Sequence, residues 1–175
     1  VRLGSGILWR KSCNISRNEV FLLRKILAIV SDLDDTLLTA DHLMTDRTVQ
    51  TLKRVLNQGM KVVLASGRSA ASMRPFVNLV GTPFPYIAYN GAQIVDAITH
   101  RPFYTREIGT DLAREALLWL EERGVYVQTY DGDDWFFEKP CAIAQEYAHS
   151  TGIRGTMTGQ KLSAFLQRPT AKLLA

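Results

Sequence analysis

Two short, continuous aliphatic runs, at residues 26–31 and 61–65, dominate the first half of the chain. Runs of this length are typical of parallel strands that are covered on both faces of a sheet. Between them, apolar residues recur at helical spacing after Thr45 or Asp46, either of which suits an N-cap, and before Gly59. A strand, a helix and a strand form a βαβ unit, whose crossover pairs the two strands in parallel. We therefore expect both strands to end at the same edge of one sheet.

Strands and helices continue to alternate up to residue 106. The next predicted elements are a helix around residues 73–80, a strand at residues 85–89 and a short hairpin of residues 93–96 and 102–104. Pro75 is expected in or near the first turn of that helix, where a missing N–H costs little. Asn90-Gly91 is typical of a tight turn.

The second half of the chain repeats this alternation. The elements expected there are a helix from Thr110 or Asp111 to Gly124, a hairpin of residues 125–130 and 135–138, a helix over residues 141–151 and a strand over residues 170–174. The buried face of the first helix is expected to hold Leu112, Ala116, Leu117 and Leu120. Residues 131–134 contain a second Asp-x-Asp, which we interpret as a hairpin turn because Asp-Gly is a strong turn signal.

Composition is that of an ordinary globular protein. Hydrophobic residues make up 46% of the chain and charged residues 22%. The sequence pI is about 9.2, which could indicate a nucleic-acid-binding protein. No basic stripe with interleaved aromatic residues occurs after residue 25, however, so we expect no nucleic-acid partner.

The N-terminal residues differ from the rest of the chain. Residues 1–25 hold six Lys and Arg residues against a single Glu, so the excess of positive charge belongs to this segment. Residues 1–18 show neither the period of a strand nor that of a helix. We therefore expect residues 1–24 to be a disordered or non-native extension.

Cysteine content and the apolar run near the N-terminus bear on the compartment. Cys13 and Cys141 give neither a disulfide framework nor a zinc pattern, which indicates a reducing environment. Arg24-Lys25 interrupts the apolar run of residues 20–30, which is therefore typical of neither a membrane span nor a signal peptide. We expect a cytoplasmic protein without a membrane partner.

Two carboxylates directly follow the first predicted strand. Asp32 and Asp34 stand two residues apart at its carboxyl end, where open α/β sheets bind ligands and where an extended backbone turns alternate side chains to a common side. Two acids in one small space repel each other unless a cation or a shared proton compensates. A calcium loop is excluded, because it needs Asp or Asn at Thr36, Gly at Leu37 and Glu at Leu43. For each aspartate alone, a turn former or helix cap is the alternative.

The second predicted strand ends in Ser66-Gly67-Arg68. A hydroxyl, a glycine that lets backbone N–H groups approach a ligand, and a cation together suit an oxyanion such as phosphate. The alternative is an ordinary strand-to-helix turn with Ser66 as the cap. Because the βαβ crossover brings this tripeptide next to Asp32 and Asp34, the two segments predict one pocket.

Three motifs in this order resemble the haloacid dehalogenase superfamily. They are Asp32-Leu33-Asp34-Asp35-Thr36-Leu37-Leu38, Ala65-Ser66-Gly67-Arg68 and Tyr89-Asn90-Gly91-Ala92. Within the superfamily, the chain is similar to Cof-type (subfamily IIB) phosphatases. The resemblance implies an α/β fold: residues 25–106 form the N-terminal part of a Rossmann-like parallel-sheet core, and residues 107–175 form an inserted α/β cap domain. Asp35 departs from the pattern, since the family more often has Gly there.

The resemblance also implies a mechanism. Asp32 would be the nucleophile that forms an aspartyl-phosphate. Asp34 would protonate the leaving alcohol and later activate water, a task suited to a carboxyl whose pKa an acidic neighbour raises. Mg²⁺ would bind one Asp32 oxygen and the Asp34 backbone carbonyl. Ser66 would hold a phosphoryl oxygen. The residues expected to bind the substrate at the mouth are Thr36, Gly67, Arg68, Asn90 and Gly91.

Two parts of the family's site have no counterpart in the sequence. Relatives return from the cap to the core and supply a lysine and a Gly-Asp-x-x-x-Asp pair that completes the magnesium site. Lys172 is not assigned to that lysine, because it falls on a predicted cap strand. We therefore expect a C-terminally truncated, impaired phosphatase of small phosphorylated metabolites, with an uncovered sheet edge and apolar face.

Other functions stay open beside a phosphatase. A non-catalytic phosphate-ester-binding module, or an inactive remnant, would keep phosphate recognition without turnover. A phosphomutase of the same superfamily would use the same aspartyl chemistry. A receiver domain also uses it but has no second half comparable to residues 107–175. Sugar phosphates, nucleotide phosphates and pyridoxal phosphate are all candidate substrates.

Overall fold

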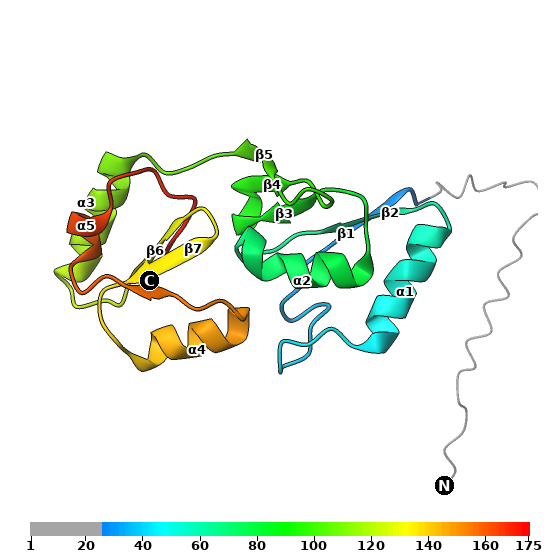
Figure 1. Cartoon of the computed structure of the whole chain (residues 1–175), viewed down its shortest axis with the longest axis horizontal. Coiled ribbons are helices and arrows are strands. Elements are labelled where there is room, and N and C mark those ends of the chain that lie inside the picture. The colour runs from blue at the N-terminus through cyan, green and yellow to red at the C-terminus, as the bar shows by residue number, and fades with distance from the viewer. Residues whose placement is uncertain (1–25) are drawn as a thin grey trace, which may run out of the picture.

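The computed structural model describes residues 26–175, and the expected extension of residues 1–24 lies outside this range. The chain forms two lobes (Figure 1). The first lobe extends to Thr105, and the second lobe begins at Thr110. Strands and helices alternate in both, which confirms the expected α/β class.

The first lobe starts with the predicted βαβ unit. β1 (Ala28–Ser31) and β2 (Lys61–Leu64) pair in parallel along their full lengths. α1 (Asp46–Asn57) connects them. β3 (Tyr86–Ala88) extends the parallel arrangement through a bridge between Ala65 and Ile87. The carboxyl ends of these three strands therefore meet at one edge of the lobe.

Both helices of the first lobe begin at a side-chain cap. Thr45 Oγ1 accepts the N–H of Thr48 at 3.2 Å, which confirms Thr45 as a predicted start of α1. α2 (Ala70–Val80) begins after Ser69, whose hydroxyl accepts the N–H of Ser72 at 3.2 Å. Because this cap starts the helix earlier than the apolar spacing indicates, Pro75 lies in the helix interior. The expectation that places Pro75 in or near the first turn is wrong, because five helical residues precede it.

β3 leads into the predicted hairpin. β4 (Gln93–Val95) pairs in antiparallel with both β3 and β5 (Pro102–Thr105). Between β3 and β4, a short 3₁₀ turn (Tyr89–Gly91) carries Asn90 with a left-handed φ of 54°. Asn90-Gly91 thus forms the predicted tight turn, and it does so at the sheet edge where β2 also ends.

β1 departs from the prediction of a strand that is covered on both faces. Within residues 26–175 it pairs only with β2, and the side chains of Ile26, Leu27 and Val30 are 65, 64 and 61% exposed. A continuous aliphatic run shows what a strand is suited to bury, but it does not show whether a neighbour covers it. The expected uncovered edge and apolar face are present in the described chain.

The second lobe is a small sheet with helices packed against it. Its elements are α3 (Thr110–Glu121), β6 (Gln128–Asp131), β7 (Asp134–Phe137), α4 (Ala142–Thr151), β8 (Thr156–Met157), α5 (Leu162–Phe165) and β9 (Leu173–Leu174). The strand order is β8-β7-β6-β9. The predicted hairpin and both predicted helices are present, and residues 131–134 form the predicted turn between β6 and β7. The sequence patterns did not predict β8 or α5.

The buried face of α3 differs from the prediction. Ala113, Leu117 and Glu121 are buried, whereas Leu112 is 63% exposed. The Glu121 carboxylate accepts hydrogen bonds from the N–H and hydroxyl of Ser163 on α5, at 3.1 and 2.6 Å. Packing against this unpredicted helix turns α3 so that Leu112 faces water, and the expected inward position of Leu112 is wrong.

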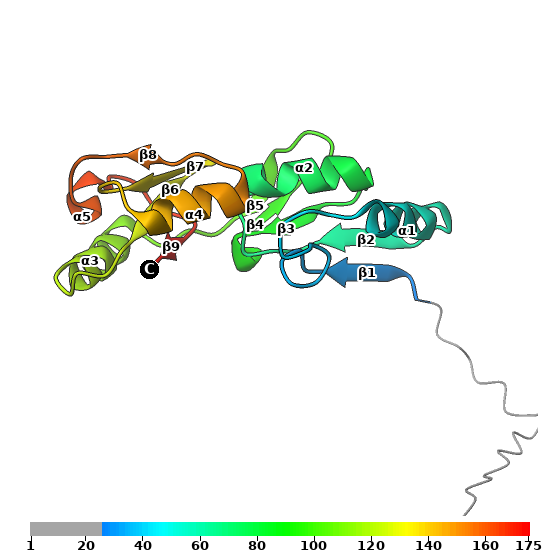
Figure 2. The same ribbon diagram turned by 90° about the horizontal axis from the view of Figure 1, so that it is seen from below.

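The two lobes share one hydrophobic core. Tyr130, Trp135 and Ala144 of the second lobe belong to the same buried cluster as the core of the first lobe. Figure 2 shows the end of α4 beside the start of α2, and Ser72 Oγ donates to the Thr151 carbonyl there at 2.7 Å.

No helix within residues 26–175 is long and apolar enough to cross a membrane.

Candidate active site

The loop after β1 turns sharply around Leu33. The N–H groups of Leu37 and Leu38 both donate to the Leu33 carbonyl at 2.9 Å, and Asp35 adopts a left-handed φ of 56°. Such a backbone favours glycine, which explains why a glycine is expected at this position. Aspartate is among the residues that tolerate the conformation best, so Asp35 is compatible with the turn.

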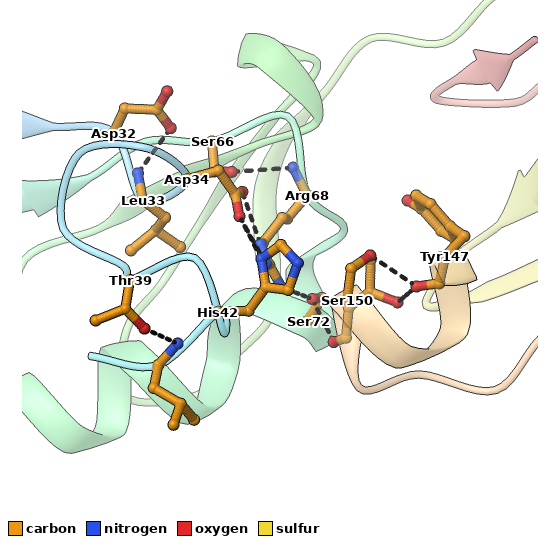
Figure 3. A network of polar contacts seen from close by, with 12 residues as sticks. Asp32, Leu33, Asp34, Thr39, His42, Ser66, Arg68, Ser72, Tyr147 and Ser150 are labelled. Carbon is orange, nitrogen blue, oxygen red and sulfur yellow. Dashed lines mark hydrogen bonds and ion pairs between the residues drawn. The ribbon is translucent and has the colours of Figure 1, made fainter. Parts of the chain in front are cut away.

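The turn separates the two candidate catalytic carboxylates. Asp32 is exposed, and its Oδ1 accepts the N–H of Leu33 at 2.7 Å. Figure 3 shows the Asp32 carboxylate pointing away from that of Asp34. Alternate side chains share a side only while the backbone stays extended, and β1 ends at Ser31. The expectation that both carboxylates occupy one small space is wrong.

Asp34 faces Arg68 instead of Asp32 (Figure 3). Arg68 Nε and Nη2 donate to the two Asp34 carboxylate oxygens at 2.8 and 2.7 Å. His42 Nδ1 lies 3.6 Å from Asp34 Oδ1. Arg68 is only 6% exposed and Asp34 is 37% exposed. A bidentate pair of this kind is stronger and more directional than a single ion pair, so it fixes the Asp34 side chain.

The same pair changes the acidity of Asp34. The hydrogen bonds from Arg68 lower the pKa of Asp34, and partial burial opposes them. The expectation that an acidic neighbour raises this pKa is wrong, because Asp32 points away and a guanidinium occupies the space instead. Asp34 is therefore an ionised acceptor at neutral pH, not a proton donor.

Ser66-Gly67-Arg68 forms a tightly held loop at the end of β2. The Ser66 N–H donates to the Ile87 carbonyl at 2.9 Å, and Ser66 Oγ accepts the N–H of Arg68 at 3.2 Å. Ser66 therefore supports the loop from within, while Ser69 caps α2. The alternative reading of Ser66 as the helix cap is wrong.

Gly67 and Asn90 bring the second and third motifs into contact. A Cβ on Gly67 would lie 3.0 Å from Asn90 Oδ1, which is closer than such atoms normally approach. Asn90 therefore lies against the phosphate-loop candidate, but it does not line the pocket that Asp34 and Arg68 share. Thr36 and Gly91 are exposed, and neither lines the pocket that Asp34 and Arg68 share.

A pocket of about 250 Å³ lies where the two lobes meet. Three of its lining residues were predicted as site residues: Asp34, Gly67 and Arg68. Five others were not: His42, Tyr147, Ser150, Thr151 and Lys172. Four of these five come from the second lobe, so only the docking of the lobes brings them to the site. His42 follows the first motif closely enough that the motif could have drawn attention to it.

The docking of the lobes is coupled to Arg68. Arg68 Nη1 donates to Ser72 Oγ at 3.1 Å, and that hydroxyl donates to the Thr151 carbonyl at 2.7 Å. Lys172 Nζ crosses in the opposite direction and donates to the Gly67 carbonyl at 3.0 Å. The phosphate-loop candidate is therefore held from both sides, by its own helix and by the second lobe.

The oxygen atoms around Asp32 and Asp34 match part of a magnesium site. Mg²⁺ prefers carboxylate and carbonyl oxygens and usually keeps several waters. The exposed Asp32 carboxylate and the Asp34 backbone carbonyl are ligands of this kind, so their chemistry fits the ion. Within residues 26–175, no group of three or more His, Cys, Asp or Glu side chains is arranged to hold a metal.

The fold and the pocket define an α/β protein with a charged site at the carboxyl edge of a parallel sheet. The sequence pattern of haloacid dehalogenase-like hydrolases matches residues 29–168, and the chain belongs to this family. A solved haloacid dehalogenase-like hydrolase from Bacteroides thetaiotaomicron is 25% identical with a TM-score of 0.75, and the match covers 85% of this chain and 57% of that one.

The chain is also similar to two phosphatases. A solved sugar phosphatase of subclass IIB is 20% identical with a TM-score of 0.63, over 81% of this chain and 55% of that one. At this level of identity the likeness concerns the fold alone. The HMP-PP phosphatase of Escherichia coli O157:H7 is 25% identical over 120 residues, which are 68% of this chain and 44% of that protein. The chain spans about half the length of the curated relatives it matches.

Proposed function

We propose that this chain carries the nucleophile and phosphate-binding half of a phosphatase active site that hydrolyses small phosphate monoesters through an aspartyl-phosphate. The observation that carries the proposal is the pocket in which Gly67, Arg68 and Lys172 surround Asp34 at the carboxyl edge of the sheet. Two cations and one carboxylate leave the pocket with an excess of positive charge. Such a pocket favours an anion with the charge of a phosphate ester.

The chemistry proposed for the two aspartates is the one that the resemblance to haloacid dehalogenases implies for these positions. An Asp32 oxygen would form a bond to phosphorus while the bond from phosphorus to the alcohol oxygen breaks, and Asp34 would give that oxygen its proton. Water would then attack phosphorus while Asp34 takes the proton, the bond from phosphorus to the Asp32 oxygen would break, and inorganic phosphate would leave with the Asp32 carboxylate restored. A magnesium ion held by Asp32 and the Asp34 carbonyl would supply positive charge against the phosphoryl oxygens.

Ionised Asp34 cannot act as the acid until its bond to Arg68 loosens. A substrate phosphate would compete with the Asp34 carboxylate for the Arg68 guanidinium, since both are oxyanions that bind it bidentately. Losing the Arg68 hydrogen bonds would raise the pKa of Asp34 toward its ordinary value. At its ordinary pKa the carboxyl would still be ionised at neutral pH, so the negative charge of the bound phosphate would have to raise the pKa further before Asp34 could donate a proton.

The substrate is expected to be a small phosphorylated metabolite. Support comes from the size of the pocket, about 250 Å³, and from relatives named as a sugar phosphatase and an HMP-PP phosphatase. Tyr147, Ser150 and His42 would meet the group that carries the phosphate. A sugar phosphate, with hydroxyls to match these polar side chains, suits the pocket better than a nucleotide, whose base needs an apolar slot.

Turnover by the 175-residue chain is proposed to be impaired. Asp32 does not line the pocket, its carboxylate points away from that of Asp34, and Asp34 is held as an ion. A phosphate-ester-binding module without turnover is therefore the second candidate function. A phosphomutase would need a second phosphate site, and the lining of the pocket supports only the first.

Hydrolysis of p-nitrophenyl phosphate with Mg²⁺ tests the proposal. The wild-type chain is expected to release p-nitrophenol barely faster than Asp32→Asn, while inorganic phosphate binds to both. Rapid turnover that Asp32→Asn abolishes would establish the phosphatase and overturn the claim of impairment. Absence of phosphate binding by the wild-type chain would overturn the phosphatase and the binding module together.

A further inference from the structure

Lys172 occupies a fixed position at the boundary between the lobes. Thr170 is fully buried and links the backbone of Tyr130 to that of Lys172. Its Oγ1 accepts a hydrogen bond from the Tyr130 N–H at 3.2 Å and donates one to the Lys172 carbonyl at 2.9 Å. From this anchored backbone, the Lys172 side chain reaches across to the first lobe. Its Nζ donates to the Gly67 carbonyl at 3.0 Å, so the ammonium lies at the phosphate-loop candidate.

The Lys172 ammonium lacks an acidic partner in the described chain. Within residues 26–175, no carboxylate lies within 4.0 Å of it. The Asp34 carboxylate, which shares the pocket, is bound by Arg68. Lys172 Nζ also lies 5.7 Å from the centre of the Tyr130 ring. Burial lowers the pKa of Lys172, and the charge of Asp34 opposes this effect.

A half-buried cation of this kind favours an anionic partner. An ammonium has three N–H donors, and one of them reaches the Gly67 carbonyl. Placing a charge away from water is costly unless it is paired. Arg68 meets this need with Asp34 and Ser72, whereas Lys172 has donors left that line the pocket.

We propose that Lys172 binds the phosphate group of the substrate from the second lobe, at the pocket that it lines together with Arg68. This inference rests on the proposed phosphatase function and adds a binding residue to it. A phosphate oxygen between Lys172 and the Ser66-Gly67-Arg68 loop links the two lobes through the ligand. Phosphate binding then requires the two lobes to be docked, because each lobe supplies only part of the binding site.

Titration calorimetry with inorganic phosphate tests the role of Lys172. Lys172→Met keeps the apolar stem and removes the charge, and it is expected to weaken phosphate binding about tenfold, the loss of one charge-assisted hydrogen bond. Lys172→Arg is expected to keep most of the affinity. The matched control is Lys161→Met, which removes the same charge from an exposed lysine paired with Glu138 and is expected to change affinity less than about twofold.

Lysine labelling of the wild-type chain gives a second measurement that does not depend on how a variant folds. Acetic anhydride acetylates uncharged amines, and mass spectrometry follows Lys172 and Lys161 separately. Saturating inorganic phosphate is expected to slow acetylation of Lys172 and to leave Lys161 unchanged.

The outcomes separate this inference from the proposed function. Equal phosphate affinity in the wild-type chain and Lys172→Met, or acetylation of Lys172 that phosphate does not slow, would overturn the inference and leave the phosphate site in place. A wild-type chain that binds no phosphate would overturn both. Weaker binding in Lys172→Met, with Lys161→Met unaffected, would support the inference.

Discussion

At the scale of single residues, the site is organised by Arg68. Its guanidinium binds both oxygens of Asp34 and the hydroxyl of Ser72, and its backbone carbonyl accepts the N–H of Tyr89 at 2.9 Å. A planar fork of donors can make these contacts together, and a lysine cannot. The charge state of Asp34 and the shape of the loop therefore depend on one side chain.

The pair predicts a pH dependence of stability. The pKa of Asp34 is lowered in the folded chain, while an unfolded aspartate has a pKa of about 3.9. The ionised carboxylate therefore stabilises the fold above about pH 3.9, and this contribution is lost as the pH falls through the lower, folded-state pKa. In urea unfolding, the difference in free energy of unfolding between the wild-type chain and Asp34→Asn is expected to shrink below pH 4. A difference that stays constant from pH 7 to pH 3 would contradict the assignment.

The sequence predicted which residues lie at the site better than it predicted where their side chains point. Asp34, Gly67 and Arg68 were all predicted for one pocket, because strand ends and the βαβ crossover place them there. The direction of Asp32 was not predictable from its spacing, since the backbone turns at Leu33. The pKa of Asp34 depends on that direction and was predicted with the opposite sign. Lys172 was noticed, but only the contact between lobes brings it to Gly67.

At the scale of elements, local signals predicted the cap of α1 but missed the Ser69 cap of α2. Thr45 starts α1 as expected, because its hydroxyl replaces a missing helical partner for the Thr48 N–H. The buried face of α3 was less predictable, because α5 sets it through Glu121. A local sequence pattern indicates which side chains of an element can be buried. Which of them are buried depends on the elements packed against it.

The cap of α1 predicts effects of opposite sign for two threonines. Thr45→Ala removes the acceptor for the Thr48 N–H and is expected to lower the free energy of unfolding by about 1 kcal/mol. Thr51→Ala, at an exposed position inside the same helix, is expected to raise it by a few tenths of a kcal/mol, about the difference in helix propensity. Urea unfolding measures both variants, and equal effects would show that Thr45 does not act as a cap.

Gly155 allows the segment between α4 and β8 to pass over Trp135. A Cβ at Gly155 would lie 2.6 Å from the Trp135 ring, which is 2% exposed and packed edge-on against Tyr147 at 5.1 Å. The ring has no room to retreat, so Gly155→Ala is expected to cost about 1–3 kcal/mol of stability.

Repeating the Gly155→Ala substitution in a variant with a smaller ring at position 135 tests whether the Trp135 contact causes the loss of stability. In a Trp135→Phe background, the smaller ring leaves space for the methyl group, and Gly155→Ala is expected to cost less than it does in the wild-type chain. Thermal or urea unfolding of the four proteins gives the coupling. The same cost in both backgrounds would show that the Trp135 contact is not the cause.

At the scale of the whole molecule, several polar contacts fasten the lobes together. Tyr89 donates from its hydroxyl to the Gly132 carbonyl at 2.8 Å, and Arg74 pairs with Asp133 at 2.7 Å. These contacts place the β6–β7 turn against the first lobe, which gives the second Asp-x-Asp a docking role beside its role as a turn. The exposed Arg74–Asp133 pair contributes little energy by itself, so the shared hydrophobic core carries most of the docking.

Within residues 26–175 nothing pairs with the outer edge of β1, and this edge predicts self-association of the chain. Exposed apolar side chains on an edge strand favour pairing with another chain, and Val30 is 61% exposed there. Val30→Lys is expected to reduce association in sedimentation velocity and to change the free energy of unfolding by less than about 0.5 kcal/mol. Ile98→Lys, at a 74% exposed site in a turn away from this strand, serves as the control. An equal reduction by both variants would contradict a role for the β1 edge.

The most direct test of the account is to locate an oxyanion on the chain. A crystal structure grown with tungstate would do this, because the metal atom marks the anion by its anomalous scattering. Tungstate is expected in the pocket between the lobes, within hydrogen-bond distance of Lys172 Nζ and the Ser66-Gly67-Arg68 loop. Tungstate bound only to exposed lysines outside this pocket would contradict it.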